Sequence, residues 1–317
     1  MNILVTGVGA IIGYGIIESL RLHDEAITII ATDIFEENHG KYTSDFFYQV
    51  PYTSDPNYEN VITKIISDHK IDLVFPGIEQ DLYYFAQHHS KFNTKFILNN
   101  LQLIELSKNK LKMYDYLEKN QFQDLIPTHT NLDFASAKEL LGVPFIIKPK
   151  SSYASKGFHI IRSEVDLESV SSEINEGTLF QPMVGSVDEE YTIAVFGDGK
   201  GNFLDSIILR RYLAASGASD KTFVIKNDDA LMKSVKVLVE LFKPIGPTNF
   251  QFRKEGEKVF LLEINPRISS SCSIRTKFGY NEPVHCINYF SKNLELIIFP
   301  KKEGKAIRYI ADNVIYE

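Results

Sequence analysis

Hydrophobic and polar residues alternate along the first hundred positions in a pattern typical of a parallel α/β fold. Residues 2–6 form an apolar run that ends at a glycine cluster, residues 11–22 carry apolar side chains at helical spacing, and residues 27–32 form a second apolar run. Strand, glycine turn, helix and strand make a βαβ unit, which predicts a parallel sheet. The pattern continues with a helix at 58–69, a strand at 71–75, a helix at 79–88 and a strand at 95–98. Residues 1–100 are therefore expected to form a small doubly wound domain.

The pattern changes after a helical stretch at 101–120 and the break at Pro127. A helix is expected at 229–242. Seven further segments have strand-like composition: 144–148, 157–162, 178–184, 190–196, 203–210, 249–253 and 258–264. Short polar or glycine-containing turns join several of these strands, as in hairpins. The second half is therefore predicted to be α+β with antiparallel pairing.

The glycine cluster of the first βα turn resembles a dinucleotide-binding fingerprint. Gly7, Gly9 and Gly13 precede the first helix, and Asp33 ends the second strand. In such a motif, glycines let a pyrophosphate approach the helix N-terminus and the acid holds a ribose. The spacing here, G-x-G-x-x-x-G, is one residue too long. Closure of a tight turn is the favoured interpretation, and an NAD-dependent oxidoreductase or epimerase stays as an alternative.

Composition and charge narrow the functional class. Hydrophobic residues make up 44% of the 317 positions and the formal net charge is −7. A basic stripe that could bind nucleic acid is not evident, and no apolar run approaches the roughly 18–20 residues that span a bilayer. The two cysteines do not suggest a disulfide framework. Together with the strand-like N-terminus, these features predict a cytoplasmic protein that binds neither nucleic acid nor membrane.

The most informative polar pattern lies near the C-terminus. Gln251 belongs to one strand, and Glu263 and Asn265 belong to its hairpin partner, followed by Pro266 and Arg267. Period-two alternation places Glu263 and Asn265 on one face, with Gln251 opposite them. One carboxylate and two amide oxygens suit Mg²⁺, which completes its coordination with water and substrate phosphates. Arg267 could clamp phosphoryl or carboxylate oxygens through its planar fork.

Lys148 is a second candidate on independent grounds. It closes the apolar run PFIIK, where a charge is costly unless an anion binds beside it. The sequence thus predicts a basic group and a metal-binding strand, both suited to phosphate chemistry.

The segments N-F-Q-F (249–252) and E-I-N-P-R (263–267), followed by Ile268-Ser269-Ser270-Ser271, resemble the ATP-grasp superfamily. The likeness is to the ATP-binding halves of the carbamoyl-phosphate synthase large subunit, and it extends over nearly the whole chain. It implies a Rossmann-like pre-ATP-grasp domain at 1–100, which does not normally bind a dinucleotide. A two-lobed ATP-grasp domain would follow at 101–317, with a hinge near 180–184.

The resemblance also assigns nucleotide-binding positions. Lys110 matches an early phosphate-contacting residue, Lys148 the lysine that reaches the ATP phosphates, and Glu190 a ribose-binding glutamate. The segment 150–157 (KSSYASKG) takes the place of a glycine-rich flap, although Gly157 is its only glycine. The remaining implied cofactor-binding residues lie in this flap and in the adenine-binding hinge: Ser151, Ser152, Ser155, Lys156, Gln181, Met183 and Val184. For Met183 and Val184, core packing is an alternative to adenine binding.

The implied activity is an ATP- and Mg²⁺-dependent ligase, in which Mn²⁺ could replace Mg²⁺. A substrate carboxylate would become an acyl phosphate, and a nucleophile, usually an amine, would then displace phosphate. Arg267, Lys148 and Arg210 are the expected catalytic residues. Both substrates would be small molecules, and a homodimer is compatible with the family. Bicarbonate-dependent carboxyphosphate chemistry and a non-catalytic ATP-binding module stay open beside the oxidoreductase hypothesis.

Overall fold

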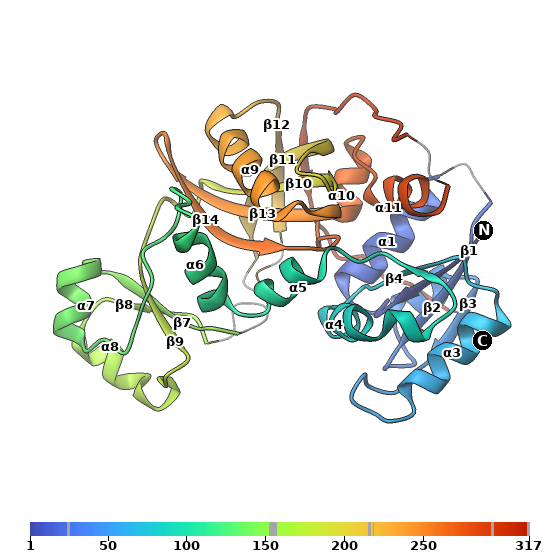
Figure 1. The fold of residues 1–317 in the computed structure, drawn as a ribbon, viewed down its shortest axis with the longest axis horizontal. Helices are drawn as coiled ribbons and strands as arrows, with labels where there is room; N and C mark the ends of the chain where they lie inside the picture. Colours follow the sequence, from blue (N-terminus) through green and yellow to red (C-terminus); the bar gives the residue numbers. More distant parts are fainter. Residues whose placement is uncertain (24–25, 152–156, 215–216, 218, 293–294, 316–317) are drawn as a thin grey trace.

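The computed structural model describes residues 1–317 except 24–25, 152–156, 215–216, 218, 293–294 and 316–317. Three sheets organise the described residues: a five-stranded sheet, a six-stranded sheet and a four-stranded sheet. Figure 1 shows two lobes that project from a central body, one at each end of the long axis. The first sheet forms one lobe, the four-stranded sheet forms the other, and the six-stranded sheet forms the body.

The N-terminal sheet is parallel, with strand order β3-β2-β1-β4-β5. Its elements are β1 (Asn2–Thr6), α1 (Ile11–Arg21), β2 (Thr28–Asp33), α2 (His39–Thr43), β3 (Phe46–Gln49), α3 (Tyr58–Asp68), β4 (Leu73–Phe75), α4 (Glu79–His88), a 3₁₀ turn (His89–Lys91) and β5 (Lys95–Phe96). The doubly wound α/β fold expected from the sequence is confirmed. Strand β3 was not expected from the sequence; it is a four-residue edge strand that is mostly exposed, although its aromatic residues favour a strand.

The glycine cluster closes the first βα turn against the β4–α4 turn. A Cβ atom added to Gly13 would lie 2.4 Å from the backbone carbonyl oxygen of Gly7. A Cβ atom added to Gly77 would lie 2.1 Å from the backbone carbonyl oxygen of Thr6. The Asp33 carboxylate accepts hydrogen bonds from the backbone N–H of Gly9 (2.8 Å) and Phe35 (3.0 Å). Backbone packing therefore accounts for these glycines, and the Asp33 carboxylate links the first βα turn to the loop that follows β2.

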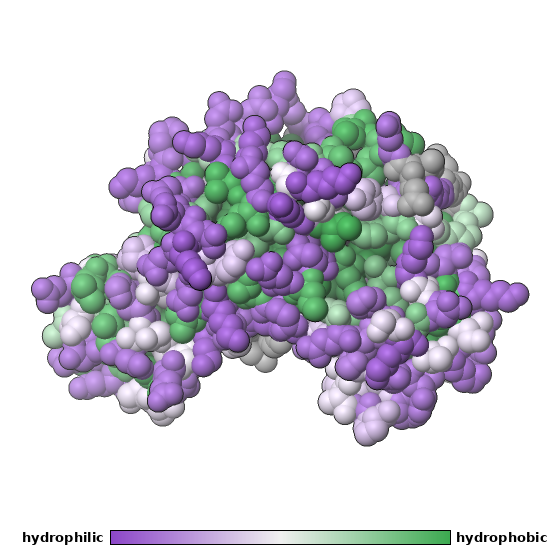
Figure 2. Space-filling model, in the orientation of Figure 1, coloured by the Kyte–Doolittle hydropathy of each residue, from purple (hydrophilic) through white to green (hydrophobic). Residues whose placement is uncertain are grey.

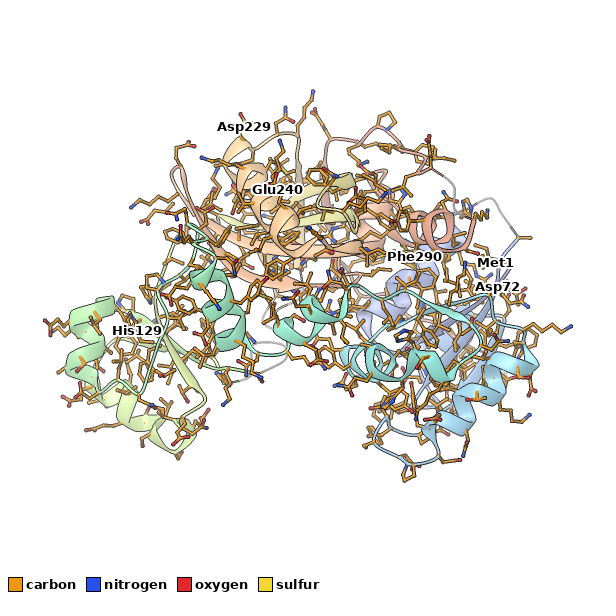
Figure 3. The ribbon with its side chains drawn as sticks, viewed as in Figure 1. Met1, Asp72, His129, Asp229, Glu240 and Phe290 are labelled. Atoms are coloured by element: carbon orange, nitrogen blue, oxygen red, sulfur yellow. The ribbon has the colours of Figure 1, made fainter. Side chains whose placement is uncertain are left out.

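The predicted helix at 101–120 is two helices, α5 (Leu101–Ser107) and α6 (Lys110–Lys119). Asn109 separates them because its side chain caps α6, accepting from the N–H groups of Leu111 and Lys112. The lobe that follows has the antiparallel order β6-β9-β7-β8. It contains β6 (His129–Thr130), α7 (Phe134–Leu141), β7 (Phe145–Pro149), β8 (His159–Ile161), α8 (Glu164–Ser169), a 3₁₀ turn (Ser171–Glu173) and β9 (Thr178–Pro182). Figure 3 labels His129 in this lobe.

The six-stranded sheet is antiparallel, in the order β14-β13-β10-β11-β12-β15. Its elements are β10 (Glu190–Asp198), β11 (Phe203–Leu213), β12 (Ser219–Ile225), α9 (Asp229–Phe242), β13 (Ile245–Glu255), β14 (Lys258–Asn265), α10 (Cys272–Lys277), α11 (Glu282–Cys286), a π-helical segment (Ile287–Lys292) and β15 (Lys305–Ile307). One face packs on α9, whose ends carry Asp229 and Glu240 in Figure 3. The other face packs against Ile274 and Tyr280.

The N-terminal domain shares a hydrophobic core with the C-terminal helices. Ile16 and Ile17 of α1 cluster with Ile268, Cys272 and Cys286, all of them buried. The Lys95 ammonium donates to the Phe290 carbonyl oxygen (2.9 Å), a contact between β5 and the π-helical segment near the label of Phe290 in Figure 3. In Figure 2, hydrophilic residues cover most of both lobes, and hydrophobic residues show mainly along the middle of the molecule. None of the helices in the described ranges is long and apolar enough to cross a membrane.

Candidate active site

The polar C-terminal strand pair forms the centre of the site. Gln251 lies opposite Glu263, and Asn249 lies opposite Asn265, in the β13–β14 register. The predicted alternation is therefore present, and Glu263 and Asn265 share one face. The Asn265 amide nitrogen donates to a Glu263 carboxylate oxygen (3.2 Å). The carboxylate is more than a third exposed, which leaves it open to a ligand.

Gln251, one of the three expected magnesium ligands, is engaged by a cation. Its side-chain oxygen accepts from Nη2 of Arg211 at 2.6 Å. A guanidinium at this distance disfavours a divalent cation at the same oxygen. The role of Gln251 as a metal ligand thus stays a prediction that would require this hydrogen bond to break.

Glu190, the expected ribose-binding residue, lies in a buried ion-pair network. Its Oε1 accepts from Arg211 (2.7 Å to Nη2) and its Oε2 accepts from Arg253 (3.0 Å to Nη2). The residue is only 3% exposed, and both of its carboxylate oxygens are occupied. A ribose hydroxyl would have to displace a guanidinium to reach it, so ribose binding by Glu190 stays a prediction that would require one of these ion pairs to break.

The expected catalytic residue Arg210 lies on the opposite face of the sheet from the site. It pairs with Tyr191 across the β10–β11 ladder, which places its neighbour Arg211 on the face of Glu190 and Gln251. Nε of Arg210 donates to the Asp188 carbonyl oxygen (2.7 Å). The structure therefore replaces Arg210 with Arg211 as the basic residue that faces the site.

Two lysines face Glu263 across a cleft. Nζ of Lys110, at the start of α6, lies 3.9 Å from a carboxylate oxygen of Glu263. Lys148 comes from β7 in the small lobe. Burial, the largest cause, and the neighbouring charge of Lys110 together lower the pKa of Lys148 to about 8, although Glu263 opposes the shift. An ammonium crowded in this way is stabilised by an anion, as the sequence indicated.

The cleft contains two adjoining pockets that share Ser107, Lys110 and Glu263. The larger pocket, about 500 Å³ of empty space including its opening, is mainly apolar and contains Lys148 and Gln181. The second, about 420 Å³, is mainly polar and contains Asn265 and Arg267 among its other lining residues. An apolar pocket beside a polar one suits a ligand with a flat apolar part and a charged part.

Part of the expected flap is anchored to the junction between α5 and α6. The Ser151 hydroxyl donates to the Lys108 carbonyl oxygen (2.9 Å), and the Lys110 N–H donates to the Lys150 carbonyl oxygen (2.8 Å). Ser151 therefore lies beside the polar pocket. Gly157 has a positive φ of 73° and does not line either pocket. The other predicted flap residues, Ser152, Ser155 and Lys156, lie outside the described residues.

The residues expected to form the adenine-binding hinge differ in burial and in whether they line the apolar pocket. Gln181 is buried at the end of β9, lines the apolar pocket and donates through Nε2 to the Thr128 hydroxyl (2.7 Å). Met183 is 37% exposed and Val184 is partly exposed, and neither belongs to the residues that line the pocket. Core packing therefore does not explain Met183, and contact of Met183 or Val184 with adenine stays a prediction.

Arg267 projects into the polar pocket, as expected, but with a partner from the N-terminal domain. Its Nη2 donates to Glu79, the first residue of α4, and also lies 3.3 Å from the Asn265 side-chain oxygen. Glu79 was missed because it precedes Arg267 by 188 residues. Its position directly after β4, at the carboxyl edge of a parallel sheet, was the available signal.

A buried arginine supports the site strands from the same face of the sheet that carries Glu263. Arg275 is fully buried and donates through Nη2 to the side-chain oxygens of Asn249 (2.5 Å) and Thr192 (2.9 Å). Its Nη1 lies 3.5 Å from the carboxylate of buried Glu282. Because Asn249 is the cross-strand partner of Asn265, this network fixes the strand that carries Glu263.

The donor set suits a metal that is shared with a substrate. No group of three or more His, Cys, Asp or Glu side chains that could hold a metal occurs among the described residues. Glu263 is a single carboxylate beside the Asn265 amide, so an ion here would rely on substrate phosphates for its other ligands. Glu263 fits Mg²⁺ in that arrangement, and Asn265 would join it only if its side-chain oxygen left the Arg267 guanidinium.

Two family models match the chain. Residues 3–98 match the PylC-like N-terminal domain, and residues 183–312 match the model described as ATP-grasp in the biosynthetic pathway with Ter operon. Among curated proteins, the chain is 24% identical over 251 residues to the carbamoyl phosphate synthase large chain of Pseudothermotoga lettingae, covering 74% of this chain and 22% of that protein. It is also 24% identical over 257 residues to the pyruvate carboxylase of Staphylococcus aureus, covering 72% of this chain and 22% of that protein. The chain thus spans about a fifth of the length of these relatives.

Solved structures share the fold. The N5-carboxyaminoimidazole synthetase of Staphylococcus aureus in complex with ADP superposes with a TM-score of 0.73 at 19% identity, covering 94% of this chain and 78% of that one. The biotin carboxylase of Campylobacter jejuni in its β,γ-ATP complex gives a TM-score of 0.71 at 15% identity, covering 96% and 74%. These likenesses confirm the architecture that the sequence motifs indicated.

Proposed function

We propose that this chain, which carries a PylC-like N-terminal domain followed by an ATP-grasp domain, is an ATP-dependent ligase that activates a carboxylate as an acyl phosphate. The observation that carries the proposal is the convergence of Lys110, Lys148 and Arg267 on the cleft that Glu263 lines. Three cations against the two carboxylates of Glu263 and Glu79 still leave an excess of positive charge, which suits a triphosphate. The domain boundary near residue 100 and the hinge near 180–184 belong to the same proposal.

The nucleotide would lie along the cleft between β7 and β14. Its base would occupy the apolar pocket beside Gln181, and its phosphates would reach the ammonium groups of Lys148 and Lys110. Arg267 would contact the transferred phosphoryl from the polar pocket. Because phosphoryl transfer depends mainly on positioning and electrostatic stabilisation, these residues suffice without a covalent enzyme intermediate.

Glu263 and Asn265 would hold Mg²⁺, and Mn²⁺ could take its place. The metal would supply neutralisation of phosphate charge in the polar pocket. Gln251 would join the metal ligands only if it left Arg211.

The second half of the reaction would couple the acyl group to a nucleophile. The substrate carboxylate oxygen attacks the γ-phosphorus and ADP departs. An amine then attacks the acyl carbon, phosphate leaves, and the amine loses a proton. Both substrates would be small molecules, which fits a polar pocket of about 420 Å³ of empty space including its opening.

Calorimetry combined with an ADP-release screen tests the proposal. Mg·ATP should bind and NADH should not, and at least one carboxylate should stimulate ADP release in the presence of an amine pool. Micromolar affinity for NADH without any heat from Mg·ATP would refute the ligase assignment. Binding of Mg·ATP without stimulation by any carboxylate would identify a non-catalytic ATP-binding module.

Bicarbonate is a second candidate for the carboxylate. The similarity to a carbamoyl phosphate synthase large chain favours it. Bicarbonate-dependent ADP release that no other carboxylate exceeds would support carboxyphosphate formation.

A further inference from the structure

An ion pair between the two domains lies at the inner edge of the polar pocket. Arg267 donates to the carboxylate of Glu79, and their side chains are only 17% and 20% exposed, respectively. Both residues line the polar pocket. Removing the partner from one member of a partly buried pair leaves an uncompensated charge, which is costly. Any ligand that separates the two groups must therefore compensate both charges.

The two charges have different surroundings. Arg267 also contacts the side-chain oxygen of Asn265 (3.3 Å), so it faces the end of the strand that carries Glu263. Glu79 belongs to the N-terminal domain and approaches from the other side of the pocket. A ligand anion bound to Arg267 would thus lie toward the phosphate side of the cleft, and a ligand cation bound to Glu79 would lie away from it.

A third pocket continues from this ion pair into the junction between the domains. It shares Leu82, Pro266 and Arg267 with the polar pocket and encloses about 270 Å³ of empty space including its opening. Its other lining residues are mainly apolar and include Phe75, Ile97, Pro247 and Ile268. The space inside is about that of one water molecule, so a group as short as a methyl would fit this lining next to the two charges.

We infer that the carboxylate substrate is a small α-amino acid bound as a zwitterion, with its carboxylate on Arg267, its ammonium on Glu79 and its side chain in the third pocket. This inference rests on the proposed ligase function. In an α-amino acid one carbon separates the two charged groups, so they can contact two side chains that already touch each other. The zwitterion replaces one ion pair with two and leaves no charge unpaired.

Simpler ligands do not meet this requirement. A monocarboxylate on Arg267 would leave Glu79 without a counter-ion in a partly buried position, and an amine on Glu79 would leave Arg267 without one. The same ion pair therefore binds the zwitterion and disfavours both the monocarboxylate and the amine.

The charge arrangement also decides which group of the amino acid reacts. The carboxylate oxygen near Arg267 forms a bond to the γ-phosphorus, the bond from that phosphorus to the bridging oxygen of ADP breaks, and an aminoacyl phosphate results. The ammonium keeps its proton on Glu79 and so does not attack. A second amine forms the C–N bond, the acyl C–O bond breaks, phosphate carries away the electron pair, and the amine proton goes to solvent.

Matched substrate pairs test the inference. We would measure ADP release with hydroxylamine as the nucleophile, comparing glycine with acetate, L-alanine with propionate, and L-2-aminobutyrate with butyrate. The value of kcat/KM should favour the amino acid by at least about 10-fold in at least one pair, because the analogue leaves a charged group unpaired. Ethylamine should not stimulate ADP release at all.

The substitution Glu79→Gln separates recognition from a merely structural contact. It should lower kcat/KM for the amino acid and raise it for the matching carboxylate, so that the preference falls by at least about 10-fold. Glu59→Gln is the matched control, since Glu59 pairs with Lys91 in the same domain but lies outside the three pockets. It should leave the preference unchanged.

Three results would overturn the inference. In the first, the wild-type protein uses the carboxylates and the matching amino acids equally well. In the second, its ADP release responds only to carboxylates without an amino group. In the third case, Glu79→Gln would slow both members of a pair equally, which would mean that Glu79 only positions Arg267. In each case ADP release would persist and the ligase function would stand. Absence of both Mg·ATP binding and ADP release would instead refute the proposed function itself.

Discussion

Replacing Lys148 with methionine should make the protein more stable and weaken its binding of Mg·ATP. The crowded cleft lowers the pKa of this side chain from the ordinary 10.5 to about 8. At about 1.4 kcal/mol for each pH unit, this difference corresponds to at most about 3.5 kcal/mol of destabilisation at neutral pH. Methionine preserves much of the apolar stem without the charge, so Lys148→Met should raise the free energy of unfolding by about 1–3 kcal/mol.

The stability difference between Lys148→Met and the wild type should depend on pH. Below pH 8 both the folded and the unfolded state carry the proton on Lys148, and the whole penalty is present. Between pH 8 and 10.5 the folded state loses this proton while the unfolded state keeps it, so the wild type gains stability as the pH rises. The advantage of Lys148→Met should therefore be largest near pH 7 and shrink steadily toward pH 10.

Urea unfolding at pH 7, 8.5 and 9.5 would measure the effect, and calorimetry would measure Mg·ATP affinity, which should fall at least about 10-fold with the lost charged contact. Lys236→Met is the control, since Lys236 is exposed on α9 and its loss should change stability by less than about 0.5 kcal/mol. A Lys148→Met protein that is less stable than the wild type at pH 7 would refute the reasoning. So would a stability difference that does not change with pH.

Three further predictions concern the site strand and its basic neighbours. Glu263→Ala should abolish ADP release while the circular dichroism melting curve stays intact, because Glu263 is the only carboxylate among the proposed metal ligands; a variant that keeps most of its activity would place the metal elsewhere. Arg267→Ala and Arg267→Lys should bind Mg·ATP nearly normally and release ADP about 100-fold more slowly, and a lysine variant at wild-type rate would exclude a bidentate clamp. Arg211→Met should lower the free energy of unfolding in urea by roughly 2–3 kcal/mol, since buried Glu190 loses one of its two partners. Arg210→Met should cost less than about 1 kcal/mol, and equal losses would contradict the positions of the two arginines.

Local patterns were sufficient for much of this protein. Alternation over 249–253 and 258–265 placed Glu263 and Asn265 on one face of a hairpin, and the structure pairs them with Gln251 and Asn249 as the pattern requires. The apolar run that ends at Lys148 indicated a lysine held at a cost, in agreement with its lowered pKa. Such features depend on neighbours within one strand or one hairpin, and the side-chain period of a strand fixes them.

Other features depended on which elements cover each face of a sheet. Arg210 and Arg211 could not be distinguished by alternation, because both faces of β11 are buried beside them: Ile208 packs toward α9, and Leu209 packs toward Ile274 on the opposite face. Gln251, expected to bind metal, and Glu190, expected to bind ribose, both accept hydrogen bonds from Arg211. These hydrogen bonds depend on the packing of three strands.

The sequence by itself therefore determined the order of the strands and helices that carry the site and the chemistry of its central hairpin. Only the tertiary structure decided which charges meet. Glu79 reaches Arg267 across 188 residues because the first parallel sheet presents its carboxyl edge to the end of β14. The side-chain periodicity of a strand or helix cannot predict that contact, because the contact arises from the packing of two domains through a shared core.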